Sequence, residues 1–103
     1  MASSYPSPAS IKTPNVSNVT SVLIAPANLS RESLYLFNPG TNVIWVCPSV
    51  SSDQTLLAAT LAGVGSVPIQ PMQGFSFPGF KGAMNAIAAA GATNVITVWE
   101  YYQ

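Results

Sequence analysis

The sequence predicts an all-β protein: a single antiparallel β-sandwich or small barrel, jelly-roll-like, with an extended N-terminal arm. Along its 103 residues, short runs rich in β-branched and aromatic residues alternate with glycine, proline and polar turns. About seven or eight such runs at this spacing are typical of a sandwich or barrel. The length suits one domain with one hydrophobic core, and the sequence contains no internal repeat.

The predicted arm covers residues 1–16, and the sandwich domain covers residues 17–103. The arm is rich in serine and contains Pro6, Pro8 and Pro14. Proline keeps the backbone extended and removes amide donors, so this segment should not lie in the interior of a sheet. The segment is either a flexible tail or, because a serine- and proline-rich arm with little to bury seldom orders itself, a segment held in place by a contact.

Residues 33–37 and 43–47 are predicted to form a hairpin around the turn NPGTN. Pro39 and Gly40 suit the two central positions of a type II turn, because proline presets φ and glycine accepts a positive φ.

Both faces of this hairpin are apolar, whereas a half-exposed hairpin alternates apolar and polar residues. One face should fill the core of the domain, and the other should contact another sheet or subunit. We expect Leu34, Leu36 and Trp45 in the core, and Tyr35 and Phe37 on the outside.

Further strands are predicted at residues 19–25 and 94–102, and in the short runs SVPIQP and GFSFPG. Residues 83–90 are alanine-rich but lie between glycines in a series of strands, so a strand is preferred to a helix. Residues 56–62 fit a helix or a strand equally well. In 94–102, odd-numbered residues should share one face and even-numbered residues the other, with Trp99 expected in the core.

Charged residues make up 6% of the sequence, three basic and three acidic. So neutral a surface gives little attraction for phosphate backbones, which argues against a nucleic-acid partner. It is better suited to burial against other protein. Arg31 and Lys81 stand alone in the sequence and are expected to be solvated, while Cys47 should be a small buried hydrophobe.

The sequence predicts no enzyme, no catalytic residue, no metal site and no cofactor. Histidine, the commonest general base and metal ligand, does not occur. The carboxylates of Glu32, Asp53 and Glu100 have no spacing that suggests a catalytic pair. The longest apolar run, residues 56–67, is too short to span a membrane, and the N-terminus lacks a secretion signal.

Amphipathic side chains are the remaining candidates for function, because such residues are enriched at protein interfaces. The predicted interface residues are Tyr5, Pro6, Tyr35, Phe37, Phe80, Tyr101 and Tyr102.

Four segments carry a resemblance to a known class of protein. They are SRESLYLFN, PGTNVIWVCPS, IQPMQGFSF and the closing GAMNAIAAAGATNVITVWE, within residues 30–100. In this order they resemble small β-rich virion proteins of tailed bacteriophages, including capsid decoration (cement) proteins. The resemblance implies a non-catalytic protein, made in the host cytoplasm, that forms a homo-oligomer on the outer capsid surface. It also implies contact with the major capsid protein, with a trimer favoured and the arm reaching a neighbour.

Two alternatives remain open. The chain could be a carbohydrate- or receptor-binding sandwich of a phage tail or fibre, because such sites use exposed aromatic side chains. It could also be a structural protein of the tail or of the head–tail joint. The low content of charged residues favours permanent burial over reversible binding.

Overall fold

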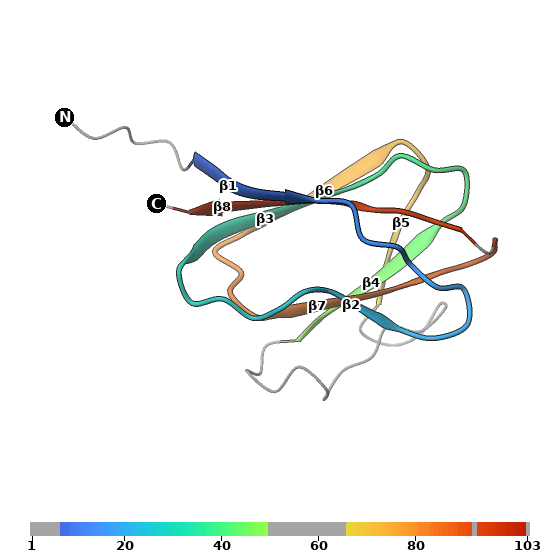
Figure 1. Cartoon of the computed structure of the whole chain (residues 1–103), viewed down its shortest axis with the longest axis horizontal. Coiled ribbons are helices and arrows are strands. Elements are labelled where there is room, and N and C mark those ends of the chain that lie inside the picture. The colour runs from blue at the N-terminus through green and yellow to red at the C-terminus, as the bar shows by residue number, and fades with distance from the viewer. Residues whose placement is uncertain (1–6, 50–65, 92, 103) are drawn as a thin grey trace.

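Two four-stranded antiparallel sheets pack face to face in the computed structural model, which describes residues 7–49, 66–91 and 93–102 (Figure 1). The first sheet has the order β1-β8-β3-β6, formed by Ser7–Lys12, Thr97–Tyr102, Arg31–Asn38 and Gln73–Pro78. The second has the order β2-β7-β4-β5, formed by Val22–Ala25, Ala83–Ala88, Ile44–Ser49 and Val67–Ile69. The predicted all-β sandwich is confirmed.

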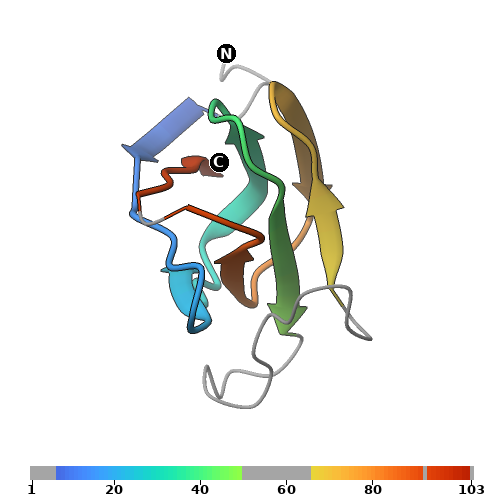
Figure 2. The same ribbon diagram turned by 90° about the vertical axis from the view of Figure 1, so that its right-hand side faces the viewer.

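The strand pairing is that of a long antiparallel ribbon rolled into a sandwich. Strand β1 pairs with β8, β2 with β7, β3 with β6, and β4 with β5. Rolling the ribbon then adds the pairs β3–β8 and β4–β7. Eight strands in two such sheets form a jelly roll, so the jelly-roll-like prediction is confirmed. Figure 2 shows the two sheets from the side.

The hydrophobic core lies between the sheets and follows the period-2 alternation of the strands. In β3, Leu34 and Leu36 point inward and are fully buried, as predicted. Each such side chain stabilises the fold by about 1.5–3 kcal/mol. The rest of the main core consists of Val16, Ile24, Ala25, Ile44, Val46, Ile69, Met84, Ala86, Ala88, Ile96 and Val98.

The predicted hairpin is wrong, because β3 and β4 lie in different sheets and the chain crosses from one sheet to the other between them. The type II turn is also wrong. Among the described glycines only Gly79 and Gly91 have a positive φ, so Gly40 does not supply the conformation that this turn requires.

The side chain of Asn38 stabilises the segment that crosses from β3 to β4 through three hydrogen bonds. Its buried side chain donates from Nδ2 to the carbonyls of Asn42, at 2.8 Å, and Ile69, at 2.9 Å. Its Oδ1 accepts the Gly40 N–H at 3.0 Å. An asparagine that bonds its own backbone two residues later is a common turn former.

Residues 83–90 form a strand as preferred, over Ala83–Ala88. Pairing with both β2 and β4 buries all six of its side chains, and this tertiary pairing overrides the helical propensity of alanine. Strand β2 begins at Val22, three residues later than position 19, where the strand was predicted. The reason is local: the Ser17 hydroxyl accepts the N–H groups of Val19 and Thr20 and holds them in a turn.

The second sheet has a smaller apolar cluster on its outer face. Cys47 and Ile87 are buried there and Trp45 packs against them. The prediction for Cys47 is confirmed. The prediction that Trp45 belongs to the main core is wrong, because it alternates with the inward-pointing Ile44 and Val46. Residues 56–62, open between helix and strand, lie outside the described residues. No helix in the described part of the chain is long and apolar enough to cross a membrane.

Candidate functional site

The outer face of the β1-β8-β3-β6 sheet carries a group of large apolar side chains that we call the aromatic face. It consists of Ile11, Tyr35, Phe37, Trp99 and Tyr101. Alternation produces it: the neighbours Leu34, Leu36 and Val98 point into the core, so the residues between them point outward. Ile11 is 60% exposed and Trp99 is 36% exposed.

Strand register places these side chains next to one another. Ile11 lies opposite Trp99, and Trp99 lies opposite Tyr35, so the three form one row across β1, β8 and β3. The ring centroids of Tyr35 and Trp99 are 5.8 Å apart, and those of Trp99 and Tyr101 are 6.3 Å apart. Rings at this separation and tilt attract each other, so the aromatic face is a connected surface.

Gly74 makes room for the tyrosine of this row. A Cβ atom at residue 74 would lie 2.1 Å from Tyr35 Oη and 2.6 Å from its Cζ. The Tyr35 ring therefore lies across the backbone of β6 and extends the aromatic face from β1, β8 and β3 over a fourth strand. Any side chain at Gly74 would lift the ring away from the sheet.

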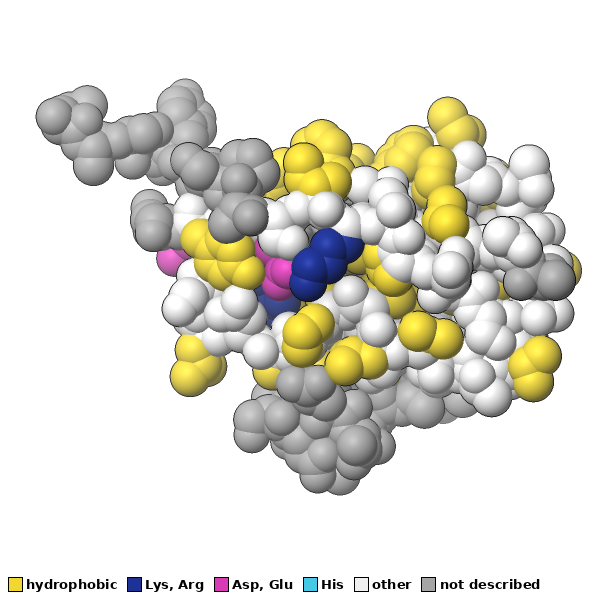
Figure 3. All heavy atoms as spheres, viewed as in Figure 1, with side chains coloured by type: hydrophobic (Ala, Val, Ile, Leu, Met, Phe, Trp, Pro, Cys, Tyr) yellow, Lys and Arg dark blue, Asp and Glu magenta, His cyan; other side chains and the backbone are white. Residues whose placement is uncertain are grey.

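No charged side chain occurs in the described rows that make up this face. The rows pair Trp99 with Ile11 and Tyr35, Tyr101 with Ser33, and Thr97 with Phe37. In Figure 3 hydrophobic side chains gather along the upper rim, over the sheet that Figure 1 shows as the upper layer. The aromatic face therefore offers van der Waals and hydrophobic contact with no charge to desolvate.

The predicted interface residues separate into three groups. Tyr35, Phe37 and Tyr101 come together on the aromatic face. Phe80 and Tyr102 lie instead beside the buried Arg31, as described below. Tyr5 and Pro6 lie outside the described residues.

The prediction that Trp99 is a core residue is wrong. It points outward, because the odd-numbered residues of 97–101 form the outer face. The even-numbered Ile96, Val98 and Glu100 are buried, so the predicted alternation of this strand is confirmed. That alternation was the signal that could have assigned Trp99 to the surface. Ile11 was missed because its row is set by pairing with a strand far along the chain.

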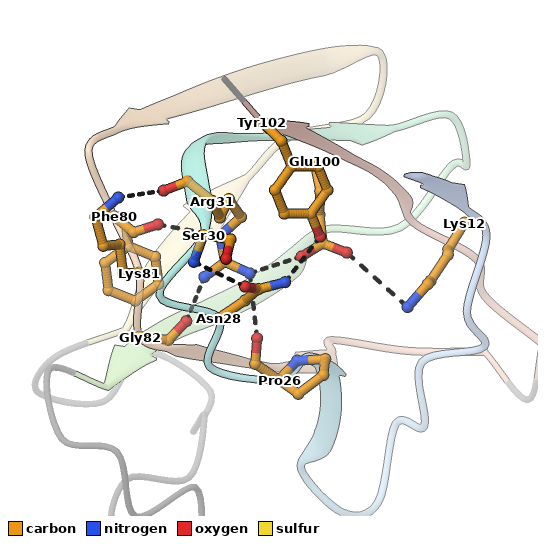
Figure 4. Close-up of polar contacts among 10 residues, drawn as sticks. All are labelled: Lys12, Pro26, Asn28, Ser30, Arg31, Phe80, Lys81, Gly82, Glu100 and Tyr102. Carbon is orange, nitrogen blue, oxygen red and sulfur yellow. Dashed lines mark hydrogen bonds and ion pairs between the residues drawn. The ribbon is translucent and has the colours of Figure 1, made fainter. Parts of the chain in front are cut away.

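The second feature of the structure that could bear on function is a buried ion pair (Figure 4). Arg31 is fully buried and donates from Nη1 to Glu100 Oε2 at 2.7 Å. Its other bonds go to main-chain oxygens: Nη1 to Pro26 at 3.1 Å, Nε to Phe80 at 3.0 Å, and Nη2 to Gly82. The guanidinium carbon also lies 5.7 Å from the centre of the Phe80 ring. The expectation that Arg31 is solvated is wrong.

Two lysines complete this cluster. Lys12 Nζ lies 3.9 Å from Glu100 Oε1, and Lys81 Nζ donates to the main-chain oxygen of Arg31. Lys81 thus has a main-chain partner and does not stand alone as expected. Near them the Asn28 amide donates to the Tyr102 hydroxyl at 2.8 Å.

The cluster joins elements of the fold and does not resemble a reaction centre. Each carboxylate oxygen of Glu100 faces a cation. The guanidinium group of Arg31 donates four hydrogen bonds to oxygens of the protein. Asp53 lies outside the described residues. Among the residues that are described, no three histidine, cysteine, aspartate or glutamate side chains gather in a way that could hold a metal ion.

The aromatic face is therefore the candidate functional site. Its residues Ile11 and Trp99 are exposed and the others are half-buried, whereas the outward-pointing Cys47 and Ile87 of the other sheet are buried. Comparison of the chain with protein-family models, with curated proteins and with solved structures found no match.

Proposed function

We propose that this chain is a structural protein of a tailed-bacteriophage virion, a non-catalytic decoration protein that stabilises the capsid by bridging neighbouring subunits. The aromatic face carries the proposal: it is a connected apolar surface without charge on one side of a rigid sandwich. The jelly roll adds support by analogy alone, because viral capsid proteins often use this architecture and fold does not imply function.

The size of the aromatic face fits a protein that acts in many copies. Four strands about 4.8 Å apart and about six residues long cover roughly 400 Å². A stable two-protein interface buries about 800 Å² on each partner, so one aromatic face alone should bind weakly. On a capsid lattice many such contacts add, because each bound copy holds the next at high local concentration.

In this proposal the partners are the major capsid protein and other copies of the chain. The aromatic face contacts the outer surface of the capsid, and the copies form a small homo-oligomer, with a trimer favoured. No cofactor takes part. The predicted arm is not wholly separate from the sandwich, because its residues Ser7–Lys12 form the edge strand β1 and Val16 lies in the core.

The test uses purified particles of the phage that encodes the chain. We expect the protein to be present in the virions, to be removable under mild conditions, and to rebind when added back. Rebinding should raise the temperature at which the particles break open. Virions that lack the protein, or particles whose heat resistance does not change on rebinding, would contradict the proposal.

Carbohydrate binding is the second candidate, because Trp99, Tyr35 and Tyr101 are aromatic residues on the outer face of a jelly roll, an architecture shared with lectins. The rings are tilted by 59° and 56° to one another, so they do not form the flat platform on which a sugar chain would stack. Titrating a Trp45→Phe variant with glycans isolates the fluorescence of Trp99. A saturable change would favour this candidate over the first.

A further inference from the structure

Strand β1 occupies an edge of its sheet and pairs with β8 alone (Figure 2). From its end the chain runs to β2 in the other sheet. Removing β1 would break its own ladder with β8 and leave the pairing between all other strands intact. The edge of β8 would then be free to accept an extended segment.

The described contacts of β1 are concentrated in its ladder with β8, and no other described strand pairs with it. Its ladder with β8 shifts register between Pro8 and Ser10, and proline has no N–H to donate. Ile11 and Lys12 are both more than half exposed, at 60% and 54%. The ion pair of Lys12 with Glu100 is long, at 3.9 Å, and Glu100 keeps Arg31 as its main partner.

The segment that follows β1 is held much more firmly. Val16 is buried, and its N–H bonds the Asn94 carbonyl at 2.8 Å. Ile96 N–H bonds the Pro14 carbonyl at 3.2 Å, and Ala88 N–H bonds the Ser17 carbonyl at 2.9 Å. The chain is therefore anchored from residue 14 onward, and the exposed Thr13 is the place where β1 can pivot.

We propose that β1 is exchanged between copies of this chain: Ser7–Lys12 of one copy pairs with the β8 edge of its neighbour. Every backbone bond and side-chain contact that β1 makes with its own β8 is reproduced in the neighbour, so exchange joins the copies at little cost. The row of Ile11, Trp99 and Tyr35 is completed in the same way, with Ile11 supplied by the neighbour. Each aromatic face is then built from two copies.

This inference rests on the self-association in the proposed function, and it names the segment that joins the copies. It does not depend on capsid binding, which the rebinding experiment measures separately. Copies that exchange β1 but do not bind particles would support the inference and contradict the virion role. Copies that bind particles without exchanging β1 would support the virion role and contradict the inference.

Disulfide trapping tests the exchange. In a Cys47→Ala background, Ile11→Cys and Trp99→Cys place two thiols opposite each other across β1 and β8. Directly opposed residues of an antiparallel pair lie within the Cα separation that a disulfide spans. The matched control is Ser33→Cys with Tyr101→Cys, opposed across β3 and β8, where β3 lies inside the sheet and is held on both sides.

After oxidation at a concentration where the wild type is oligomeric, we expect covalent multimers of the Ile11→Cys/Trp99→Cys variant on a non-reducing denaturing gel. The control pair should form its disulfide within one chain, so that only monomers appear on the gel. If both variants form the disulfide within one chain and stay monomeric on the gel, β1 remains with its own chain and the inference is wrong. A wild type that stays monomeric at every concentration would also overturn it.

A second measurement needs no substitution and applies even if a cysteine variant fails to fold. Oligomers are formed from equal amounts of ¹³C-labelled and unlabelled wild-type chains. Isotope-filtered NMR should then show a contact between the Ile11 methyl groups of a labelled copy and the Trp99 indole of an unlabelled copy. The presence of this contact within one chain only would exclude the exchange.

Discussion

Arg31 and Glu100 form a 2.7 Å ion pair inside the protein, although they lie 69 residues apart in the sequence. The side chains are 0% and 5% exposed. Moving such charges out of water is costly, and the three main-chain carbonyls that accept from Arg31 offset part of that cost. The pair ties β3 to β8, and the carbonyls tie both to the loops at Pro26 and at 80–82.

Removing one partner of this pair should strongly destabilise the fold. We expect Arg31→Met to lower the free energy of unfolding by about 3–5 kcal/mol, because the Glu100 carboxylate remains buried without its main cation. Lys12→Met is the matched control, since Lys12 faces the same carboxylate from a half-exposed position. It should cost about 1 kcal/mol or less. Urea unfolding measures both, and equal losses in the two variants would contradict the assignment.

Gly74→Ala should push Tyr35 away from β6. The new Cβ would lie 2.1 Å from Tyr35 Oη, so we expect a loss of about 1–3 kcal/mol in the free energy of unfolding. Tyr35→Ser should remove most of that penalty, which a double-mutant cycle measures. Gly40→Ala is the control, because its nearest neighbour is at 3.4 Å. Strict additivity of the two substitutions would show that the ring does not lie over Gly74.

Asn38→Ala should destabilise the crossing between the sheets. It leaves the carbonyls of Asn42 and Ile69 and the N–H of Gly40 without their partner, at about 1–3 kcal/mol for each group that stays buried. The exposed Thr41, in the same crossing, provides Thr41→Ala as the control, with a change below about 0.5 kcal/mol. Thermal or urea unfolding that shows the same stability for both variants would contradict this role.

The local pattern of the sequence predicts most strands and their faces. Alternation correctly assigns Leu34 and Leu36 to the core and Tyr35 to the outside, and it separates Val98 from Trp99. The prediction of Trp99 in the core follows from residue type, because large aromatic side chains are highly buried on average. The error came from giving residue type more weight than register.

Pairing between distant strands cannot be predicted from these local patterns. Pro39 and Gly40 suit a hairpin turn as well as a crossing between sheets, and only the side chain of Asn38 decides between them. The partner of Arg31 is set by the β3–β8 register, which depends on the whole rolled ribbon. A carboxylate at an inward position of an apolar strand, as Glu100 is, was the available signal that a buried cation must exist.

The most direct test of the central claim compares two surface substitutions in binding to capsids stripped of this protein. Trp99→Ser removes the centre of the aromatic face, and Leu23→Ser removes a side chain of similar exposure, 41%, on the other sheet. Sedimentation with the particles measures the affinity of each variant. The account predicts at least a tenfold weaker affinity, about 1.4 kcal/mol, for Trp99→Ser and no change for Leu23→Ser. Equal affinities of the wild type and both variants would show that the aromatic face is not the contact surface.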